Sequence, residues 1–461
     1  MKLRQFLNEL PETLDETYER ILRGVNRAQK DDAHRLLQCL TVAVRPLRVE
    51  ELAEILAFDF KSSKEGGIPK LKENWRWDGE AVLSTCSSLI AVTRTGDSRV
   101  VQLSHSSVKE YLTSPRLTGS HEDILQLNID PEPAHTIMLH ASLGTLLHLH
   151  DHADSKGVEG FPLVKYAAQP WVDHAQFKEL SSRIRDRLYY LFDSSKPHFI
   201  EWRRRVRGMD EDWPGFTDWP RRLDHSGSPL YYAAFCGVHD LAEHLIMEHP
   251  EQVNAAGGRI LAPLPAALYK GHFRIANLLH ENGAVVDVQG QFTRTPLHTA
   301  SMYGRVDITR WILDHGADAN ARKGDHWTPL HLAAHNMHPE VVQVLLEYGA
   351  ESGINSQNDK DRTPLYEALF YPGTSLEVKV VFDVVRRLLE HGANPNIRDR
   401  SQSTPLHRAS SKGWVEVARL LLGYGANVDE RDEEGRTPFH VASSKGHHET
   451  TNLLLEHGAV P

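Results

Sequence analysis

The stretch Thr328-Pro329-Leu330-His331-Leu332-Ala333 decides the fold, because close variants of it recur along the second half of the chain. The copies start at positions 228, 262, 295, 328, 363, 404 and 437, so they are separated by 34, 33, 33, 35, 41 and 33 residues. A Gly-Ala pair keeps the same spacing, with its glycine at positions 283, 316, 349, 392, 425 and 458. Two phrases locked to one period of about 33 residues indicate a repeat protein.

Each copy predicts a pair of short helices followed by a hairpin. The Thr or Ser at the first position can cap a helix with its hydroxyl, and the Pro after it stands where its missing N–H costs nothing. Apolar residues at helical spacing then predict a second helix, for example over 415–422, closed by the glycine of the Gly-Ala pair. In five copies a glycine nine residues after the capping position can end the first helix: Gly237, Gly271, Gly304, Gly413 and Gly446.

These phrases resemble the ankyrin repeat, and the resemblance covers residues 223–461. It implies a mostly α fold, an ankyrin-repeat solenoid of about seven repeats. Ala262 replaces the capping residue of the second copy, which predicts a weaker helix there, and eight extra residues in the fifth copy predict a protruding loop around 370–375. No polar capping repeat follows Gly458. We therefore expect either that the array continues in a parent protein or that its last apolar face is exposed and can self-associate.

The front half predicts a different structure. Amphipathic helices are expected over 14–25, 33–43 and 49–57, and another over 78–88. Two strands, 89–93 and 100–103, flank the turn sequence Thr95-Gly96-Asp97-Ser98, and a helix is expected over 105–112. Helices followed by a small hairpin predict a winged-helix-like module over residues 1–115.

Three phrases of this module, in the order Leu10-Pro11-Glu12-Thr13-Leu14, Arg45-Pro46-Leu47-Arg48 and Leu103-Ser104-His105-Ser106, resemble the segment after the NACHT domain of fungal NACHT-ankyrin proteins. The resemblance implies a protein related to the STAND class of signalling ATPases, represented here by the part that follows the nucleotide-binding domain. It continues through residues 116–222, which look like the α-helical connector that precedes the ankyrin array of that family, here 223–461. We therefore expect the recognition or scaffold arm of a NACHT-ankyrin-like signalling protein.

Composition excludes several other classes. The 461 residues suffice for about three domains of ~150 residues. With a net charge of −10, a broad phosphate-binding surface is not expected. Three separated cysteines offer neither a disulfide framework nor a zinc site, and no apolar run reaches the ~18 residues of a membrane span. We expect an intracellular, cytoplasmic protein without membrane contact, and the sequence leaves the nucleus open.

Catalysis is not expected. The sequence contains no G-x-x-x-x-G-K-[ST] loop to hold ATP phosphates and no G-x-S-x-G elbow, so no enzyme activity, cofactor or small-molecule substrate is expected. His148 and His152 are spaced as zinc-binding pairs are, near His140 and His150, but no third ligand is implied. The histidines of the repeat phrases are expected to hydrogen-bond neighbouring hairpins or helix ends instead.

An alternative is a nucleic-acid-associated regulatory binder. It would act through the winged-helix module or through the segment Arg203–Arg222, where arginines alternate with Trp202, Trp213 and Trp219. The acidic residues Glu50, Glu51 and Glu54 would repel phosphate. We expect instead that these aromatic residues pack the connector against the first repeat, so nucleic acid is an unfavoured partner.

The leading hypothesis places function on the concave ankyrin face, where a protein partner would bind. Positions seven and eight residues after each capping residue are expected to be exposed there, and aromatic side chains are typical of binding hot spots. The expected protein-binding residues are Phe235, Tyr269, Met302, Tyr303, Trp327, His335, Phe370 and Tyr371.

Overall fold

The computed structural model is mostly helical, as the sequence predicts, and divides into two compact units. The first comprises residues 1–252 and 257–259, and the second comprises residues 253–256 and 260–461. The residues that the structure describes are 13–26, 29–60, 69–72, 83–84, 88–96, 98–114, 125–151, 161–168, 170–176, 182–205, 227–257, 262–287, 294–370 and 378–461.

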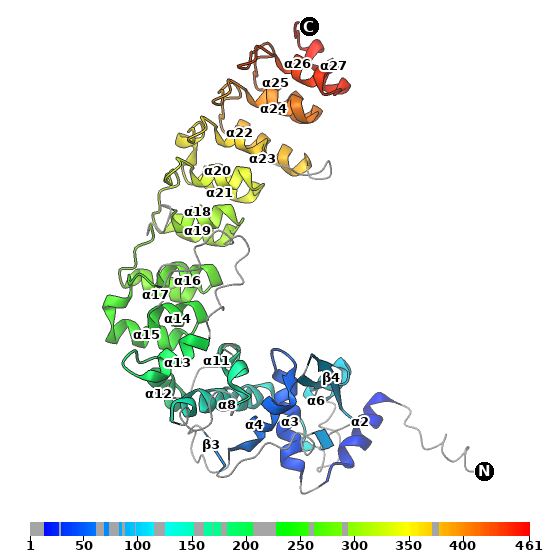
Figure 1. Ribbon diagram of the computed structural model, residues 1–461, viewed down its shortest axis with the longest axis vertical. Helices are drawn as coiled ribbons and strands as arrows, with labels where there is room; N and C mark the ends of the chain where they lie inside the picture. The colour runs from blue at the N-terminus through cyan, green and yellow to red at the C-terminus, as the bar shows by residue number, and fades with distance from the viewer. Residues whose placement is uncertain are drawn as a thin grey trace, which may run out of the picture. The chain divides into compact units, whose positions relative to one another are not determined.

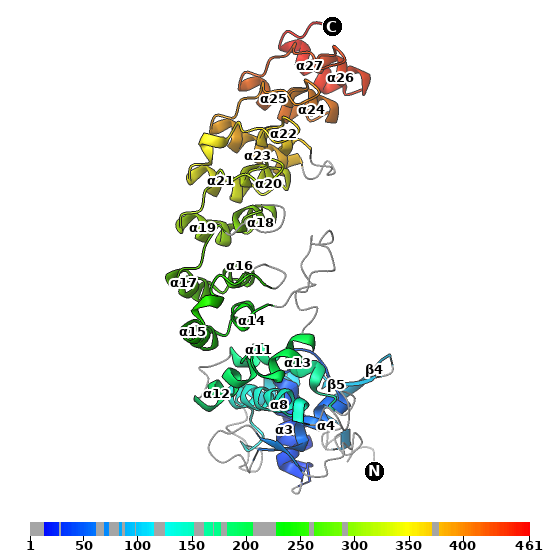
Figure 2. The same cartoon turned by 60° about the vertical axis from the view of Figure 1, so that its left-hand side comes forward.

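The first unit begins with a winged-helix module, which confirms this part of the predicted fold class. Its three-stranded antiparallel sheet has the order β1-β5-β4, with Val101 paired to both Leu47 and Val92, and Figure 2 shows β4 and β5 projecting from the helices. The helix expected over 78–88 lies outside the described residues except for 83–84 and 88, and 83–84 are helical. The elements are α2 (Leu14–Arg23), α3 (Lys30–Val42), β1 (Leu47–Arg48), α4 (Val49–Ala57), β2 (Phe58–Asp59), β3 (Lys70–Leu71), β4 (Ile90–Thr95), β5 (Ser98–Leu103) and α6 (Ser106–Thr113).

In the described part of the connector, five helices surround an aromatic core. Trp171 and Trp202 are fully buried, and the Trp202 indole N–H donates to the Ala168 carbonyl at 3.0 Å. Among the helices that the structure describes, none combines the length and the hydropathy needed to cross a membrane. The connector helices are α8 (Pro131–Asp151), α10 (Val164–Ala167), α11 (Trp171–Ala175), α12 (Ser182–Leu191) and α13 (Pro197–Arg205).

The first ankyrin repeat completes this unit with α14 (Pro229–Cys236), α15 (His239–Glu248) and η4 (Pro250–Gln252). The Ser228 hydroxyl caps α14 by accepting the Tyr231 N–H at 3.1 Å, and Gly237 ends the helix at φ +77°. Tyr232 packs edge-on against Trp202 at 5.2 Å between ring centroids. Connector and first repeat therefore share one core, which confirms the expected packing role for Trp202.

The second unit contains repeats two to seven, whose helix pairs follow one another as a stack (Figure 1). Thr328 shows the shared chemistry of the predicted caps, because its Oγ1 accepts the His331 N–H while the His331 ring accepts the Thr328 N–H. The elements are α16 (Pro263–Lys270) and α17 (Phe273–Glu281), α18 (Pro296–Met302) and α19 (Val306–Asp314), α20 (Pro329–His335) and α21 (Pro339–Glu347), η6 (Ala350–Gly353), α22 (Pro364–Ala368) and α23 (Val378–Glu390), α24 (Pro405–Lys412) and α25 (Val415–Gly423), α26 (Pro438–Ser444) and α27 (His448–Glu456).

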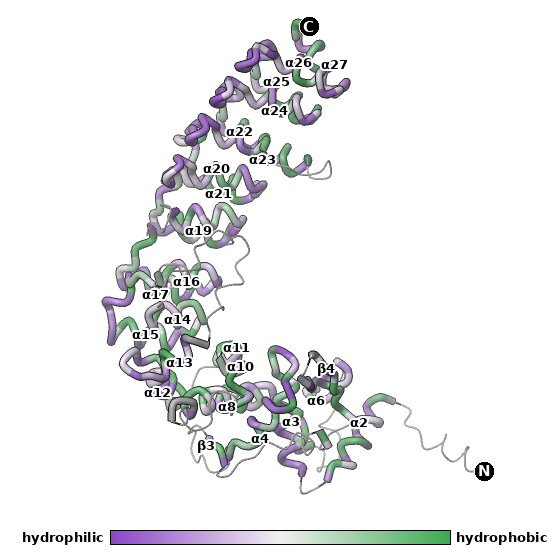
Figure 3. Tube along the Cα trace, in the orientation of Figure 1, coloured by the Kyte–Doolittle hydropathy of each residue, from purple (hydrophilic) through white to green (hydrophobic). Residues whose placement is uncertain are grey.

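Hydrogen bonds join successive repeats along the hairpins, which Figure 3 shows as largely hydrophilic around α20 to α25. The Asn320 and Asn396 side chains donate to the carbonyls of Gly349 and Gly425 in the next repeat, at 3.1 and 2.9 Å. The side-chain Oδ1 of Asn396 also accepts the backbone N–H of Asn427 at 2.8 Å. A side-chain ladder therefore fixes the spacing of hairpins that could otherwise slide.

Two departures of the repeat pattern have structural outcomes. Ala262 makes no side-chain cap bond, yet α16 is eight residues long, as α14 and α24 are. In the fifth repeat α23 has 13 residues where α19, α21, α25 and α27 have nine, so four of the eight extra residues add about one helical turn. The expected loop at 370–375 is thus only part of the insertion, and its residues 371–377 lie outside the described structure.

Candidate protein-binding groove

Three positions of each repeat meet on the inner helices of the second unit. They are the residue before the capping Thr and the residues four and seven positions after it. The first and last of these touch within a repeat, since the Arg294 guanidinium reaches the Met302 sulfur at 4.0 Å and the Trp327 and His335 rings lie 5.3 Å apart. Positions four and seven after the cap are one helical turn apart, which places them on the same face of the helix.

Five residues at these positions and five neighbouring residues line an open groove of about 450 Å³, which runs from the third repeat to the hairpin of the fifth. Trp327 provides its aromatic surface, and the Lys323 ammonium lies 5.3 Å from the Trp327 ring. Lys323 is itself bound to Asp325 at 2.5 Å, so this pair carries little net charge. The lining residues are Arg294, Met302, Lys323, Asp325, Trp327, Leu332, His335, Asn336, Asp359 and Lys360.

The groove brings together three of the predicted binding residues, Met302, Trp327 and His335. Tyr269 and Tyr303 are half-buried and do not line it, and Tyr371 lies outside the described residues. Phe370 is half-buried and belongs to the adjoining polar cluster.

Phe235 needs a correction. It was expected on the surface, but its side chain is 3% exposed and its ring stacks on Tyr231 at 6.2 Å between centroids. The connector approaches the end of the same helix, where the Gln176 amide donates to the Cys236 carbonyl at 2.6 Å. Counting from the cap could not reveal that the connector covers this helix, so Phe235 is a packing residue.

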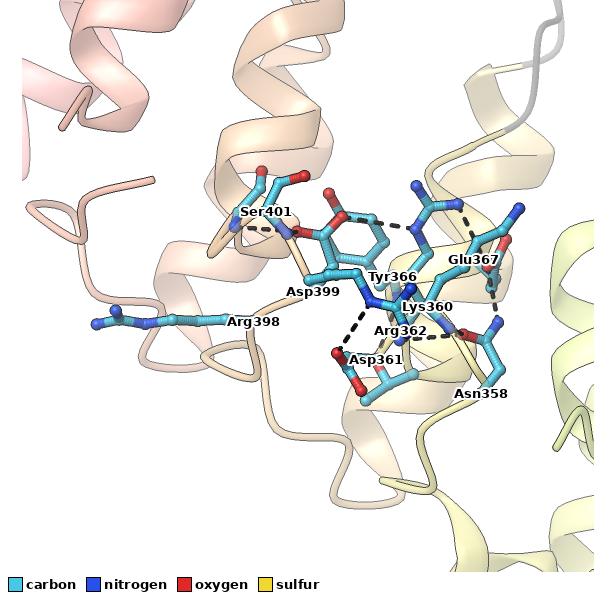
Figure 4. A network of polar contacts seen from close by, with 12 residues as sticks. Asn358, Lys360, Asp361, Arg362, Tyr366, Glu367, Arg398, Asp399 and Ser401 are labelled. Atoms are coloured by element: carbon cyan, nitrogen blue, oxygen red, sulfur yellow. Dashed lines mark hydrogen bonds and ion pairs between the residues drawn. The ribbon is translucent and has the colours of Figure 1, made fainter. Parts of the chain in front are cut away.

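A polar cluster closes one side of the groove around the buried carboxylates of Glu367 and Asp399 (Figure 4). Glu367 accepts from the Asn358 amide at 3.0 Å and faces the His335 ring at 3.1 Å. Burial alone would raise the pKa of Glu367, but these hydrogen bonds and the Arg362 charge hold that pKa below its usual range. Arg362 spans the two carboxylates, 3.7 Å from Glu367 and 3.5 Å from Asp399.

Phe370 joins this cluster to the sixth repeat. The guanidinium carbons of Arg362 and Arg408 each lie 3.8 Å from the centroid of the Phe370 ring. Such cation–π contacts are typical of arginine, whose planar group is weakly hydrated. Three further residues of the inner face were not predicted from the sequence, although each occupies the fourth position after a cap: Leu332, Glu367 and Arg408.

The repeat histidines have the structural role that the sequence analysis expected. The Nε2 atoms of His298, His331 and His407 lie 3.1, 3.0 and 3.0 Å from backbone carbonyls of the next hairpin, those of Trp327, Arg362 and Arg436. In the connector, His148 bonds the Gly144 carbonyl of its own helix at 2.7 Å. Among the described residues no three His, Cys, Asp or Glu side chains are grouped to hold a metal ion, and His152 lies outside them.

The winged-helix module meets the connector through the buried carboxylate of Glu54, and Glu51 is buried within the module itself; both were expected as surface charges. Glu51 is fully buried and binds Arg45 at 2.7 Å, while Glu54 accepts from the Thr145 hydroxyl at 2.8 Å and the Leu163 N–H at 2.7 Å. Burial raises the pKa of Glu54 to about 7. Glu54 therefore stabilises the contact with the connector, and Glu51 holds Arg45 and Arg48 of its own module. Neither carboxylate lies at the surface, where both had been expected to repel phosphate.

Only the start of the second proposed nucleic-acid segment, residues 203–205, is described, and the Trp202 that precedes it packs inward. Trp202 is buried against Phe192 at 4.8 Å between ring centroids, and the Arg203 guanidinium lies 5.9 Å from the Phe199 ring. Trp213, Trp219 and Arg222 lie outside the described residues.

Stacked helix pairs, capped Thr-Pro phrases and a hairpin-lined groove define an ankyrin-repeat protein. A family model for ankyrin repeats (three copies) matches residues 230–323, 264–358, 322–399 and 376–461, which together make half of the chain. The chain belongs to the ankyrin-repeat family. A model described as the winged helix domain of GPI inositol-deacylase matches residues 18–122.

A curated relative matches part of the chain. The azaphilone pigments biosynthesis cluster protein L of Monascus ruber is 31% identical over 303 residues. The alignment covers 62% of this chain and 62% of that relative, so it spans less than two thirds of either protein.

Proposed function

We propose that this chain is a non-catalytic protein-interaction module that binds its partner through the groove of repeats three to five. The observation that carries the proposal is the convergence of Met302, Trp327 and His335 on one open surface. An accessible Trp beside a flexible Met is typical of protein-binding hot spots. The fixed ladder of hairpins supports binding because a rigid surface loses little conformational entropy on association.

We further propose that the module is the recognition or scaffold arm of a NACHT-ankyrin-like signalling protein. The winged-helix match beside an ankyrin array supports this order of modules. The relative in a pigment biosynthesis cluster suits a role in which the partner belongs to a biosynthetic or regulatory assembly. In this proposal the groove recognises the partner and the front module transmits or anchors the complex.

Photo-crosslinking of the full chain tests the site. A photoreactive phenylalanine at Asn336, in the groove, should crosslink a partner in a cell extract, whereas the same residue at exposed Tyr424 or Arg94 should not. Trp327→Ala should weaken capture by about thirtyfold, the effect of a hot-spot residue worth ~2 kcal/mol. Crosslinks that persist in Trp327→Ala, or that form only at Arg94 on the wing, would place binding elsewhere.

A further inference from the structure

Arg408 lies on the groove side of the sixth repeat with its hydrogen-bonding capacity unused. Its guanidinium is half-buried over Phe370, and among the described residues no carboxylate lies within 4 Å of it and no acceptor receives its N–H groups. An arginine offers five N–H donors in a planar fork that matches a carboxylate. Stacking on Phe370 holds this fork in place before any ligand arrives.

The nearby carboxylates are already occupied. Glu367 is bound by Asn358 and faces His335, and Asp399 accepts the Ser401 and Ser403 N–H groups at 3.0 and 3.1 Å. Arg362 lies between both carboxylates. Burial and the neighbouring Arg362 charge lower the pKa of Arg408, which agrees with an arginine that lacks a directly bonded anion.

Two further cations line the groove without an ion-pair partner among the described residues. Arg294 touches only the Met302 sulfur at 4.0 Å, and the side chain of exposed Lys360 makes no ion pair. Two carboxylates line the groove. Asp325 is bound to Lys323, whereas the Asp359 carboxylate has no cation within 4 Å among the described residues. Among the described residues in and beside the groove, five cations stand against four carboxylates, because Arg362 is shared by Glu367 and Asp399. The surplus is one positive charge, and the cations without an ion pair are Arg294, Lys360 and Arg408.

From this charge distribution we infer that the groove of repeats three to five, together with Arg408 on the adjoining sixth repeat, binds an acidic segment of the partner protein. One carboxylate of the segment binds the Arg408 fork beside Phe370, an apolar side chain packs on Trp327, and a second carboxylate lies near Arg294 or Lys360. The inference rests on the proposed function, since it names the chemistry of the partner at that same site.

A protein segment fits this surface better than a nucleic acid. Asp325, Asp359, Glu367 and Asp399 stand between the cations and would repel a continuous row of phosphates. Separate carboxylates, spaced along an extended peptide, can reach each cation while avoiding these anions.

A peptide display library tests the inference on the full chain. Twelve-residue peptides are selected on the immobilised protein, and the strongest is labelled with fluorescein and titrated by fluorescence anisotropy. We expect at least two Asp or Glu residues around an apolar residue, and about tenfold weaker binding when these acids become Asn and Gln. Arg408→Gln and Arg408→Lys should each weaken binding by about tenfold, because lysine keeps the charge but loses the planar fork.

Matched variants separate the outcomes. Arg419→Gln changes an exposed arginine on α25 of the same repeat and should leave the affinity unchanged. If Arg408→Gln changes the helical circular dichroism and is therefore misfolded, the affinity of Arg408→Lys for the peptide is compared with that of the natural chain instead. Neutral peptides, the absence of any selected peptide, or acidic peptides that bind Arg408→Gln and Arg408→Lys as tightly as the natural chain would overturn the inference. Binding lost with Trp327→Ala but kept in both Arg408 variants would preserve the proposed function and reject the acidic partner.

Discussion

Acid should destabilise the ankyrin array through its buried histidines, and His331 gives the sharpest test. Its ring is fully buried, with Nε2 3.0 Å from the Arg362 carbonyl and Nδ1 3.2 Å from the Thr328 N. A carbonyl only accepts and a backbone N–H only donates, so the ring must be neutral with its proton on Nε2. Burial, opposed in part by the Arg362 carbonyl, lowers the pKa of His331 from 6.5 to about 4.

The magnitude follows from linkage. The unfolded chain takes up the proton near pH 6.5 and the folded chain only near pH 4, so the unfolded state binds more protons between these values. Stability is therefore present above pH 6.5 and lost as the pH falls. At ~1.4 kcal/mol per pKa unit, the full loss is about 3 kcal/mol, of which about 2 kcal/mol appears between pH 7.5 and 5.0.

Urea unfolding followed by circular dichroism at pH 7.5 and 5.0 measures this loss. His331→Gln cannot titrate, so it should be less stable than the natural chain at pH 7.5 but lose about 2 kcal/mol less on acidification. His298→Gln should behave alike, because burial also lowers the pKa of His298 to about 4. Equal losses in the natural chain and in both variants would refute the assignment of neutral, buried rings.

Four other substitutions have defined outcomes. Asp287→Asn should raise the free energy of unfolding by about 1 kcal/mol in urea melts. Asp287 occupies the repeat position at which the Asn254 and Asn320 amides donate to a glycine carbonyl of the next repeat, and an aspartate side chain has no N–H to donate. Burial also raises the pKa of Asp287, so the charged form is disfavoured there. Met337→Gly should stabilise by about 1 kcal/mol, since Met337 has φ +59°, whereas Gly304→Ala should destabilise because its Cβ would lie 2.6 Å from His338. With the pKa of Glu54 raised to about 7, unfolding free energy should fall as the pH rises from 6 to 8, and Glu54→Gln should flatten that dependence.

The features predicted from the sequence are those fixed by neighbours along the chain. A Thr, the Pro after it and the His three positions later form a cap from their own atoms, so Thr295, Thr328 and Thr404 start helices where expected. The period also predicts the contacts of His331 with the next hairpin, because every repeat presents the same carbonyl. Local chemistry and a strict repeat together were enough to predict the paired helices of the described residues between 228 and 461, except for the extra turn of α23.

The features missed by the sequence depend on partners that are distant in the chain. Glu54 meets Thr145 and Leu163 across 91 and 109 residues, so nothing around it indicates that this carboxylate is buried. Arg408 stacks on a ring of the preceding repeat, across an insertion that breaks the period. The groove was only half predicted for a related reason: the inner face includes the position four residues after the cap, one turn before the positions that were counted.

Left-handed backbone at residues other than glycine is confined, in the described part of the chain, to repeats four to six and their hairpins. Among the described residues, the non-glycine positions with positive φ are His326, Asp361, Gln402 and Met337, all within these repeats or their hairpins. The first three occupy the hairpin position that Gly435 fills in the seventh repeat, at φ +75°. A side chain in this conformation costs about 1 kcal/mol relative to glycine. Glycine at these four positions should therefore stabilise the array, and because none of the four residues lines the groove, the substitutions should leave partner binding unchanged.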